Sequence, residues 1–441
     1  MNILIQNGTI VTSEKSINSD IYISDGIILQ IGNSLDINDE IDKTIDAAGK
    51  LIFPGGIDPH VHMHLPTPAG FSADDFETGS KAALKGGTTT LIDFVTPHKG
   101  QSLIDAFIDR KSEADKSFCD YSFHISPVEW TNTTEQEIKD CIESGITSFK
   151  VYMAYKDSIG LDNDDILKVM QIVGEAGGIV TLHCELGDEI DDLRNELANK
   201  GNLSSEFHPF SRPDYTEAEA VRSAIEMASI ANCHIYIVHT SCAKSIDYIK
   251  KAQKDGQVVY SETCPQYLIL DDSKYLGDFK DTSKYVMSPP LRKKKDQHAL
   301  WDAINTGVIK TVGTDHCPFN LEQKEKGIHD FRMIPNGAGG VEHRMTLLFT
   351  YGVLQNRITY NQFVDVTSTQ AAKIFGLYPQ KGEISVGSDA DLVIWNPKAE
   401  NTISVANHHQ NCDLEIYEGI KTIGAPEFVI SDGEIVVENE N

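Results

Sequence analysis

The sequence predicts an α/β protein: a (β/α)8 barrel of the TIM type with a small β-sandwich domain formed by both chain termini. Two observations lead to this prediction. Short apolar, strand-like runs alternate with amphipathic helical patterns through the middle of the chain, and both ends contain only short alternating strands. A chain of 441 residues has room for one large domain with an appendage.

The two ends of the chain show the same sequence pattern. The N-terminal runs "ILIQNGTIV" and "DIYISDGIILQIG" alternate apolar with polar residues and contain glycines at turn-like places. The C-terminal runs "DLVIWNP" and "EFVISDGEIVVE" repeat this pattern. We therefore expect residues 1–52 and 380–441 to form the small β domain, and residues 53–379 to form the barrel.

The middle of the chain carries eight strand-like runs, most of them followed by helical patterns such as "DDILKVMQIVGEAGG". This alternation is typical of a (β/α)8 barrel, in which the chemistry lies at the C-terminal ends of the strands. No GxGxxG motif follows the first run, which disfavours the alternative of a doubly wound open sheet. The runs cover residues 57–62, 88–95, 120–127, 148–155, 179–185, 234–240, 257–263 and 308–315.

Charge and cysteine content limit the function classes. A formal net charge of −28 argues against nucleic acid and anionic membrane as partners, because both attract basic surfaces. The 8 cysteines include no CxxC pair, so we expect reduced, buried thiols in a cytoplasmic protein. The N-terminal residues do not resemble a signal peptide, and no run approaches the roughly 18 apolar residues of a membrane span.

Side chains that can bind metals recur at the C-terminal ends of the predicted strands. One histidine at a strand end is usually an ordinary polar residue, but several at matching depth converge on the barrel axis. Histidine nitrogens and a carboxylate suit zinc, and equally manganese or cobalt. These residues are His60, His62, His183, His239 and Asp315, with Lys150 at the same depth on a further strand.

Lys150 permits two interpretations. Its ammonium group cannot bind a cation, and burying it unpaired is costly, so it could form a salt bridge with Asp315 or another carboxylate. Alternatively, its amine could react with carbon dioxide to give an anionic carbamate whose two oxygens bridge two metals. Composition alone leaves both interpretations open.

A series of ordered motifs resembles one family. "GGIDPHVH", "GGTTTLIDF", "SFKVYMAY", "YIVHTSC", "SETCPQYL", "MSPPLR", "GTDHCPF", "IPNGAGGVEHRM" and "VGSDADLVIWNP" look like the cyclic amidohydrolases, namely the dihydropyrimidinases and hydantoinases of the amidohydrolase superfamily. The resemblance extends from about residue 3 to residue 437. It implies hydrolytic opening of a 5,6-dihydropyrimidine or 5-substituted hydantoin ring to an N-carbamoyl amino acid.

The resemblance also implies a binuclear centre. His60, His62 and Asp315 would hold one divalent ion, His183 and His239 a second, and a carboxylated Lys150 would bridge them, with carbon dioxide as the source of the carbamate. Zinc is the favoured metal. A hydroxide between the ions would be the nucleophile, and Asp315 would transfer its proton to the leaving nitrogen.

Substrate contacts follow from the same resemblance. Tyr155 matches a tyrosine that stabilises the oxyanion, and Ser288 and Asn336 match positions that hold the amide and imide edge of the ring. Cys317 is interpreted as structural. His64 occupies the place where dihydroorotases carry arginine, which argues against dihydroorotate. We interpret it as a substrate-binding residue of the pocket or its rim, with a solvated loop histidine as the alternative.

Two alternatives remain open within the resemblance. The enzyme could be an allantoinase or another cyclic amidohydrolase. It could also be a non-catalytic dihydropyrimidinase-like scaffold, but such proteins lose the ligands, and all six positions are present here. The family resemblance further implies a homo-oligomer, a tetramer or a dimer, that acts on a small cyclic amide.

Overall fold

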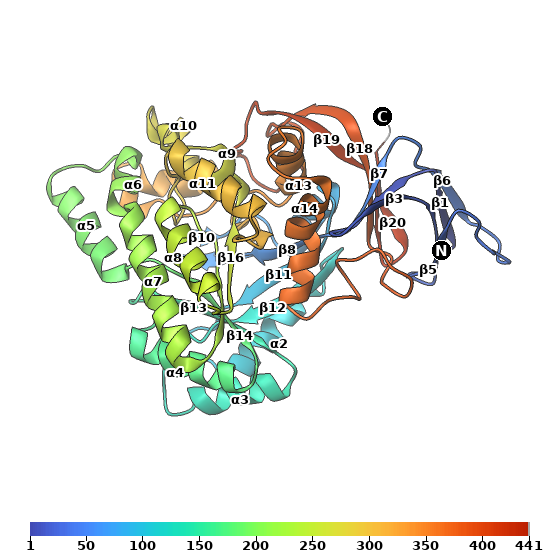
Figure 1. Ribbon diagram of the computed structural model, residues 1–441. Helices are drawn as coiled ribbons and strands as arrows, with labels where there is room; N and C mark the ends of the chain where they lie inside the picture. The colour runs from blue at the N-terminus through green and yellow to red at the C-terminus, as the bar shows by residue number, and fades with distance from the viewer. Residues whose placement is uncertain (440–441) are drawn as a thin grey trace.

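The computed structural model describes residues 1–439 and consists of a barrel with a β-sandwich at its side (Figure 1). Eight parallel strands follow one another around the barrel in the order of the chain. The predicted barrel and the terminal strands are both confirmed. The barrel strands are β8 (Gly56–Val61), β11 (Thr88–Val95), β12 (Asp120–Ile125), β13 (Ser148–Tyr152), β14 (Ile179–His183), β15 (His234–Ile237), β16 (Val259–Thr263) and β17 (Thr311–Val312).

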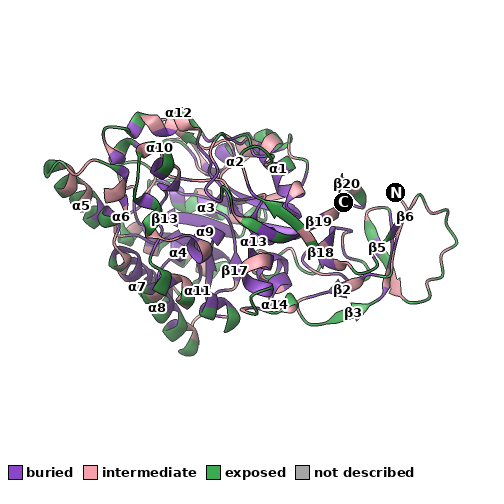
Figure 2. Ribbon diagram, turned by 90° about the horizontal axis from the view of Figure 1, so that it is seen from above, coloured by how far each residue is buried: buried purple, intermediate pink, exposed green. Residues whose placement is uncertain are grey.

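Helices cover the outside of the barrel, because each crossover between parallel strands packs an apolar helix face against them. Figure 2 shows the buried strands inside and exposed residues along the outer faces of these helices. The main helices are α1 (Phe76–Lys85), α2 (Leu103–Ala114), α3 (Thr134–Glu143), α4 (Asn163–Glu175), α5 (Gly187–Asn199), α7 (Asp214–Ala231), α8 (Ala243–Lys254), α11 (Lys294–Asn305), α13 (Arg344–Leu348) and α14 (Tyr360–Val364).

The last barrel strand is shorter than the run of residues 308–315 predicts. Pairing of β17 with β16 stops after Val312, and a side chain at Gly313 would collide with the carboxylate of Glu262. The chain then pairs with the first strand instead. The backbone N–H of Asp315 donates to the carbonyl of His60 at 2.9 Å, and that of His62 donates to the carbonyl of His316 at 2.9 Å. These bonds close the barrel.

The sandwich consists of two sheets and takes strands from both ends of the chain, and both ends of the described chain lie within it (Figure 1). A core of isoleucines from the two sheets, with Leu392 and Ile394, holds them together. The four-stranded sheet contains β1 (Ile3–Gln6), β4 (Asp20–Ser24), β5 (Ile27–Gly32) and β6 (Lys43–Asp46). The six-stranded sheet contains β2 (Thr9–Val11), β3 (Ser16–Asn18), β7 (Leu51–Pro54), β18 (Leu392–Thr402), β19 (Lys421–Ser431) and β20 (Glu434–Glu438).

The six-stranded sheet also joins the barrel. Strand β7 from the N-terminal part pairs with β18 from the C-terminal part, and Phe53 and Trp395 of this pair pack against Phe349 and Phe363. All four side chains are fully buried. The predicted segment 380–441 ends two residues beyond the described part of the chain. No helix within residues 1–439 combines the length and apolarity of a membrane span.

Candidate active site

Three of the predicted ligands meet where the barrel closes. The Nε2 atoms of His60 and His62 lie 3.2 Å apart, and Oδ1 of Asp315 lies 3.2 Å from the first and 3.1 Å from the second. The closing backbone bonds between β8 and the chain after β17 cause this approach, because they set His60 beside Asp315. Three ligand atoms at such mutual distances can share one divalent ion.

Glu262, at the end of β16, orients this group. Its Oε1 lies 2.7 Å from Nδ1 of His60, so that imidazole donates Nδ1–H to the carboxylate and presents Nε2 to the site. Oε2 accepts a hydrogen bond from the hydroxyl of Tyr236 at 2.8 Å. Burial opposes protonation of His60, but the charges of Glu262 and Asp315 outweigh it and raise its pKa to about 9. A carboxylate–histidine pair of this kind is the usual support of a metal-binding histidine.

His183 and His239 form a second pair at the ends of β14 and β15. Nε2 of His239 lies 2.9 Å from Nδ1 of His183, and the His239 ring lies 5.5 Å from the His60 ring, so the two groups are adjacent. Glu185, which ion-pairs with Arg212, lies 2.8 Å from Nε2 of His183. Two imidazoles alone are an incomplete ligand set for a divalent ion, so this pair needs a further anionic ligand.

Lys150 lies between these groups and is almost fully buried. Its Nζ lies 4.9 Å from the centre of the Phe94 ring, which also contacts the rings of His60 and His62. Among the residues that the structure describes, no carboxylate forms an ion pair with Lys150, so the salt-bridge interpretation loses its partner. Burial lowers the pKa of the Lys150 amine to about 8. Part of the Lys150 amine is therefore neutral near neutral pH, and reaction with carbon dioxide requires this neutral form.

The predicted substrate residues lie on loops around this group. Burial raises the pKa of Tyr155, with Arg212 and a hydrogen bond with Ser288 partly offsetting it. The phenol therefore stays protonated and can donate to an oxyanion. Nδ2 of Asn336 donates to Oγ of Ser288 at 2.9 Å. The buried Lys324 fixes this pair of loops, since its ammonium donates to three backbone carbonyls in them.

His64 lies apart from the metal-type group. Its ring stacks on Phe71 at 4.0 Å with 12° between the planes, and its Nδ1 lies 3.8 Å from Glu113. The side chain is 40% exposed, so it lies at the rim. Cys317 is buried, and burial raises the pKa of its thiol above the ordinary range, so it is an unreactive thiol.

Backbone strain concentrates at this site. Nine non-glycine residues in the described chain have a positive φ, and four of them are candidate site residues. They are His64 (49°), Tyr155 (62°), His239 (37°) and Asp315 (54°). Such conformations cost free energy and persist where the surrounding structure fixes a side chain in place.

Sequence reasoning missed Glu262, Glu185, Arg212 and Lys324. The first two ended apolar runs, "VVYSET" and "IVTLHCE", and a carboxylate at the end of a barrel strand was a usable signal. Arg212 and Lys324 lie on helical or loop segments without strand context, so nothing in the sequence pattern distinguished them from solvated charges.

Comparison with known proteins identifies the family. The sequence profile of the amidohydrolase family matches residues 51–436. The chain is 44% identical to the D-hydantoinase of Geobacillus stearothermophilus over 443 residues, which cover 100% of this chain and 94% of that protein. It is 41% identical to the dihydropyrimidinase of Rattus norvegicus, over 99% of this chain and 85% of that protein.

The chain belongs to the dihydropyrimidinase and D-hydantoinase family. Its fold is that of the family as well: it is similar to the crystal structure of dihydropyrimidinase from Brevibacillus agri NCHU1002, with a TM-score of 0.97, 42% identity, and coverage of 100% of this chain and 95% of that one. The protein is thus a cyclic amidohydrolase, with a candidate metal site at His60, His62 and Asp315.

Proposed function

We propose that this enzyme opens the ring of a 5,6-dihydropyrimidine or a 5-substituted hydantoin to give an N-carbamoyl amino acid. The observation that carries the proposal is the convergence of six ligand-type side chains from five barrel strands and the residues that directly follow them, described above. We assign His60, His62 and Asp315 to one divalent ion, and His183 and His239 to a second. Carboxylated Lys150 bridges the two in this proposal.

The donor set fits two zinc ions. It contains four imidazoles and one carboxylate. Its single cationic member, the buried Lys150, lacks a carboxylate partner among residues 1–439, and a carbamate formed with carbon dioxide would remove that uncompensated charge. Bound divalent ions would lower the pKa of a water and polarise the ring carbonyl.

The chain's own side chains account for the proton and charge movements. Asp315 accepts the proton of the attacking water and returns it to the ring nitrogen as the carbon–nitrogen bond breaks. The Tyr155 hydroxyl donates to the oxygen that becomes negative. Ser288 and Asn336 hold the polar edge of the ring, and His64 with Phe71 lines the side of the pocket that receives the substituent.

A substrate panel tests this proposal. Dihydrouracil, dihydrothymine, hydantoin, phenylhydantoin, allantoin and dihydroorotate are incubated with the enzyme and with Asp315→Asn, and products are identified by mass spectrometry. We expect N-carbamoyl products from the first four compounds with the wild type only. Preferential opening of allantoin would establish the allantoinase alternative, and no opening of any ring would establish the scaffold alternative.

We further propose that the enzyme is a cytoplasmic homo-oligomer, a dimer or a tetramer. Its eight cysteines are buried and unpaired, which suits a reducing compartment. We also propose the division into a sandwich of residues 1–52 and 380–441 and a barrel of residues 53–379.

A further inference from the structure

A long connection between two paired strands folds back onto the barrel. Strands β18 and β19 are antiparallel neighbours, yet residues 403–420 separate them, whereas such neighbours are usually joined by about 2–5 residues. We call residues 403–420 the crossing segment. Most of it has no regular secondary structure of its own. A connection of this kind needs specific contacts to hold it in one conformation.

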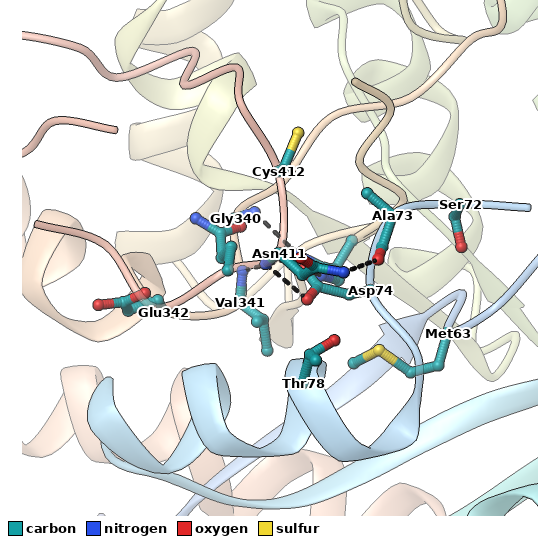
Figure 3. A network of polar contacts seen from close by, with 12 residues as sticks. Met63, Ser72, Ala73, Asp74, Thr78, Gly340, Val341, Glu342, Asn411 and Cys412 are labelled. Carbon is teal, nitrogen blue, oxygen red and sulfur yellow. Dashed lines mark hydrogen bonds and ion pairs between the residues drawn. The ribbon is translucent and has the colours of Figure 1, made fainter. Parts of the chain in front are cut away.

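The first group of these contacts consists of hydrogen bonds from the crossing segment to the loops at the barrel top. The backbone N–H of Asn411 donates to Asp74 at 2.9 Å and its side-chain amide donates to the carbonyl of Ala73 at 2.9 Å, as Figure 3 shows. Oδ1 of Asp413 accepts the backbone N–H of Leu321 at 2.8 Å, and the backbone N–H of Asp413 donates to Oδ1 of Asn320 at 2.9 Å. Asn411, Gly340 and Val341 gather around Asp74 in this view.

The second group of contacts is a buried cluster of side chains that can bind metals. Oε2 of Glu415 lies 3.0 Å from Nε2 of His343 and 3.1 Å from Nδ1 of His408. Glu415 and His408 belong to the crossing segment, and His343 directly precedes α13 on the barrel. The side chains of His343, His408 and Glu415 are 8%, 3% and 1% exposed. The amide nitrogen of Gln410 lies 3.3 Å from each of the three ligand-type atoms.

The hydrogen bonds of His408 leave a lone pair directed into the cluster. Nε2 of His408 lies 2.9 Å from the carbonyl of Cys412, which can only accept, so Nε2 carries the hydrogen. Nδ1 of the neutral ring therefore presents its lone pair to the carboxylate of Glu415. Two acceptor atoms that face each other at 3.1 Å are held together either by a proton on Nδ1, which the charge of Glu415 favours by raising the pKa of His408, or by a metal ion between them. Fixing one ring nitrogen on a carbonyl is how proteins orient a metal-binding histidine.

The side chain of Gln410 provides independent evidence for a cation at this cluster. Its side chain is 94% buried, since its relative exposure is 6%, and its Oε1 has no hydrogen-bond partner in the described structure. The oxygen and nitrogen of an amide exchange places when the group turns by about 180°, and the two orientations have nearly the same shape. After that turn the orphaned oxygen lies where the nitrogen is now, beside all three ligand atoms.

The spacing of this cluster matches that of the candidate active site, where the ligand atoms lie 3.1–3.2 Å apart. A third cluster of acidic residues, Asp120, Asp391 and Asp432, differs in kind. Lys381 ion-pairs there with Asp120 and, at 2.7 Å, with Asp391, so a side-chain cation already lies beside two of its three carboxylates. Within residues 1–439 no lysine or arginine ion-pairs with Glu415.

We propose that His343, His408 and Glu415 bind one structural zinc ion, with the amide oxygen of Gln410 as its fourth ligand. Two imidazoles, a carboxylate and an amide oxygen form a closed four-coordinate set, as structural zinc sites require. The ion fastens the crossing segment to the chain that precedes α13. It is separate from the metals proposed for the reaction, and it takes no part in ring opening.

The zinc also supports the loops behind Asp315. The backbone N–H of Gly340 donates to Nδ1 of His316 at 3.1 Å, and Nε2 of His316 donates to Asp74, which also accepts from the crossing segment. His316 follows Asp315 in the chain. Fixing His343 and the crossing segment therefore fixes both sides of the polar network around His316.

Metal content per chain tests the proposal. The protein and three variants, His408→Asn, Glu415→Gln and His409→Asn, are equilibrated with micromolar zinc, freed of excess, and measured by inductively coupled plasma mass spectrometry. His409 is the matched control, because it neighbours His408 but is exposed and pairs with Glu342. We expect the first two variants to lose about one zinc per chain and His409→Asn to lose none. Equal zinc content in all four proteins would overturn the proposal.

Anomalous diffraction at the zinc absorption edge gives a test without substitutions. The wild-type crystal should show a peak about 2.0–2.2 Å from His343 Nε2, His408 Nδ1 and Glu415 Oε2. The same peak should remain in His60→Asn, where the candidate active site is damaged, so failure of the proposed catalytic centre and failure of this site are distinguishable. A map of the wild type without this peak would refute the structural zinc.

Discussion

Glu262 connects three strands beneath the candidate active site. Besides the Nδ1–H of His60 and the hydroxyl of Tyr236, it accepts the backbone N–H of His239 at 3.0 Å. The carboxylate thus touches one residue from each of the two ligand groups. Its charge fixes the His60 tautomer that a metal at Nε2 requires.

Removal of that charge should weaken metal binding without unfolding the protein. Glu262→Gln keeps the shape of the side chain but no longer stabilises His60, so we expect metal affinity to fall about 10- to 100-fold. Competition with a chromogenic chelator measures this. Tyr236→Phe, which removes only one partner of Glu262, is the control and should change affinity less. Unchanged affinity in Glu262→Gln would contradict its supporting role.

Lys150 is the residue on which the binuclear proposal depends most. Lys150→Ala should lose the bridge, so the variant should hold about one metal ion fewer at the active site than the wild type and lose ring-opening activity. Metal analysis after gel filtration measures the difference, with the partly exposed Lys156→Ala as control. Two tightly bound active-site metals in Lys150→Ala would show that the bridge is not this lysine.

His208 gives a prediction about pH and stability. Burial, and next the charge of Arg212, lower its pKa to about 3, and its Nε2–H donates to the carbonyl of Met287 at 2.8 Å. The unfolded chain takes up this proton near pH 6.5 but the folded chain does not. Stability from this residue is therefore complete above about pH 6.5 and falls as pH decreases, by about 3 kcal/mol at pH 4.

Urea unfolding between pH 4 and pH 7 checks this, with His208→Gln as the comparison. Glutamine can still donate to Met287 but does not titrate, so the variant should lose less stability than the wild type as the pH falls. Parallel curves for the two proteins would show that His208 does not remain neutral in the folded state.

At the scale of elements, the strand ends position the site and a small hairpin borders it. Strands β9 (Pro66–Thr67) and β10 (Gly70–Phe71) form a two-stranded hairpin. Its Phe71 stacks on His64, so the two rings form one continuous surface. In the described chain, no hydrogen bond joins the side chains of His64 and Phe71 to the group formed by His60, His62 and Asp315.

His64→Ala should therefore change substrate preference more than metal content. Loss of the stacked ring widens the rim and removes a partner of Phe71, so the ratio of kcat/KM for phenylhydantoin to that for dihydrouracil should shift several-fold. Steady-state kinetics and metal analysis are measured on the same preparation, with the exposed His98→Ala as control. Loss of metal with an unchanged ratio would instead assign His64 to the metal set.

The elements also show why sequence reasoning succeeded or failed. The sequence brought the six candidate ligand positions to attention because each lies on a barrel strand or shortly after its end, and the strands follow from local apolar runs; their role as ligands stays a prediction. The early end of β17 could not be predicted, since the chain after Val312 pairs with the first strand, and the space beside Gly313 is occupied by Glu262, both distant in sequence. The crossing segment carries no apolar periodicity, so its return to the barrel depends on tertiary contacts alone.

At the scale of the whole molecule, the two ends of the chain are interdependent. Strand β7 lies between β2 from the N-terminal part and β18 from the C-terminal part, so the six-stranded sheet is complete only when both ends are present. Trp395 and Phe53 then attach that sheet to the barrel. The shared style of the two ends predicted this union, but not which strands pair, because register depends on long-range packing.

For the molecule as a whole, the central claim is that ring opening depends on metal ions bound at the top of the barrel. The most direct test is ring opening of dihydrouracil and hydantoin by protein stripped of metal with a chelator and then titrated with zinc, while circular dichroism monitors the fold. The account predicts that the stripped, folded protein is inactive and that zinc restores activity. Full activity of stripped, folded protein in the presence of excess chelator would contradict it.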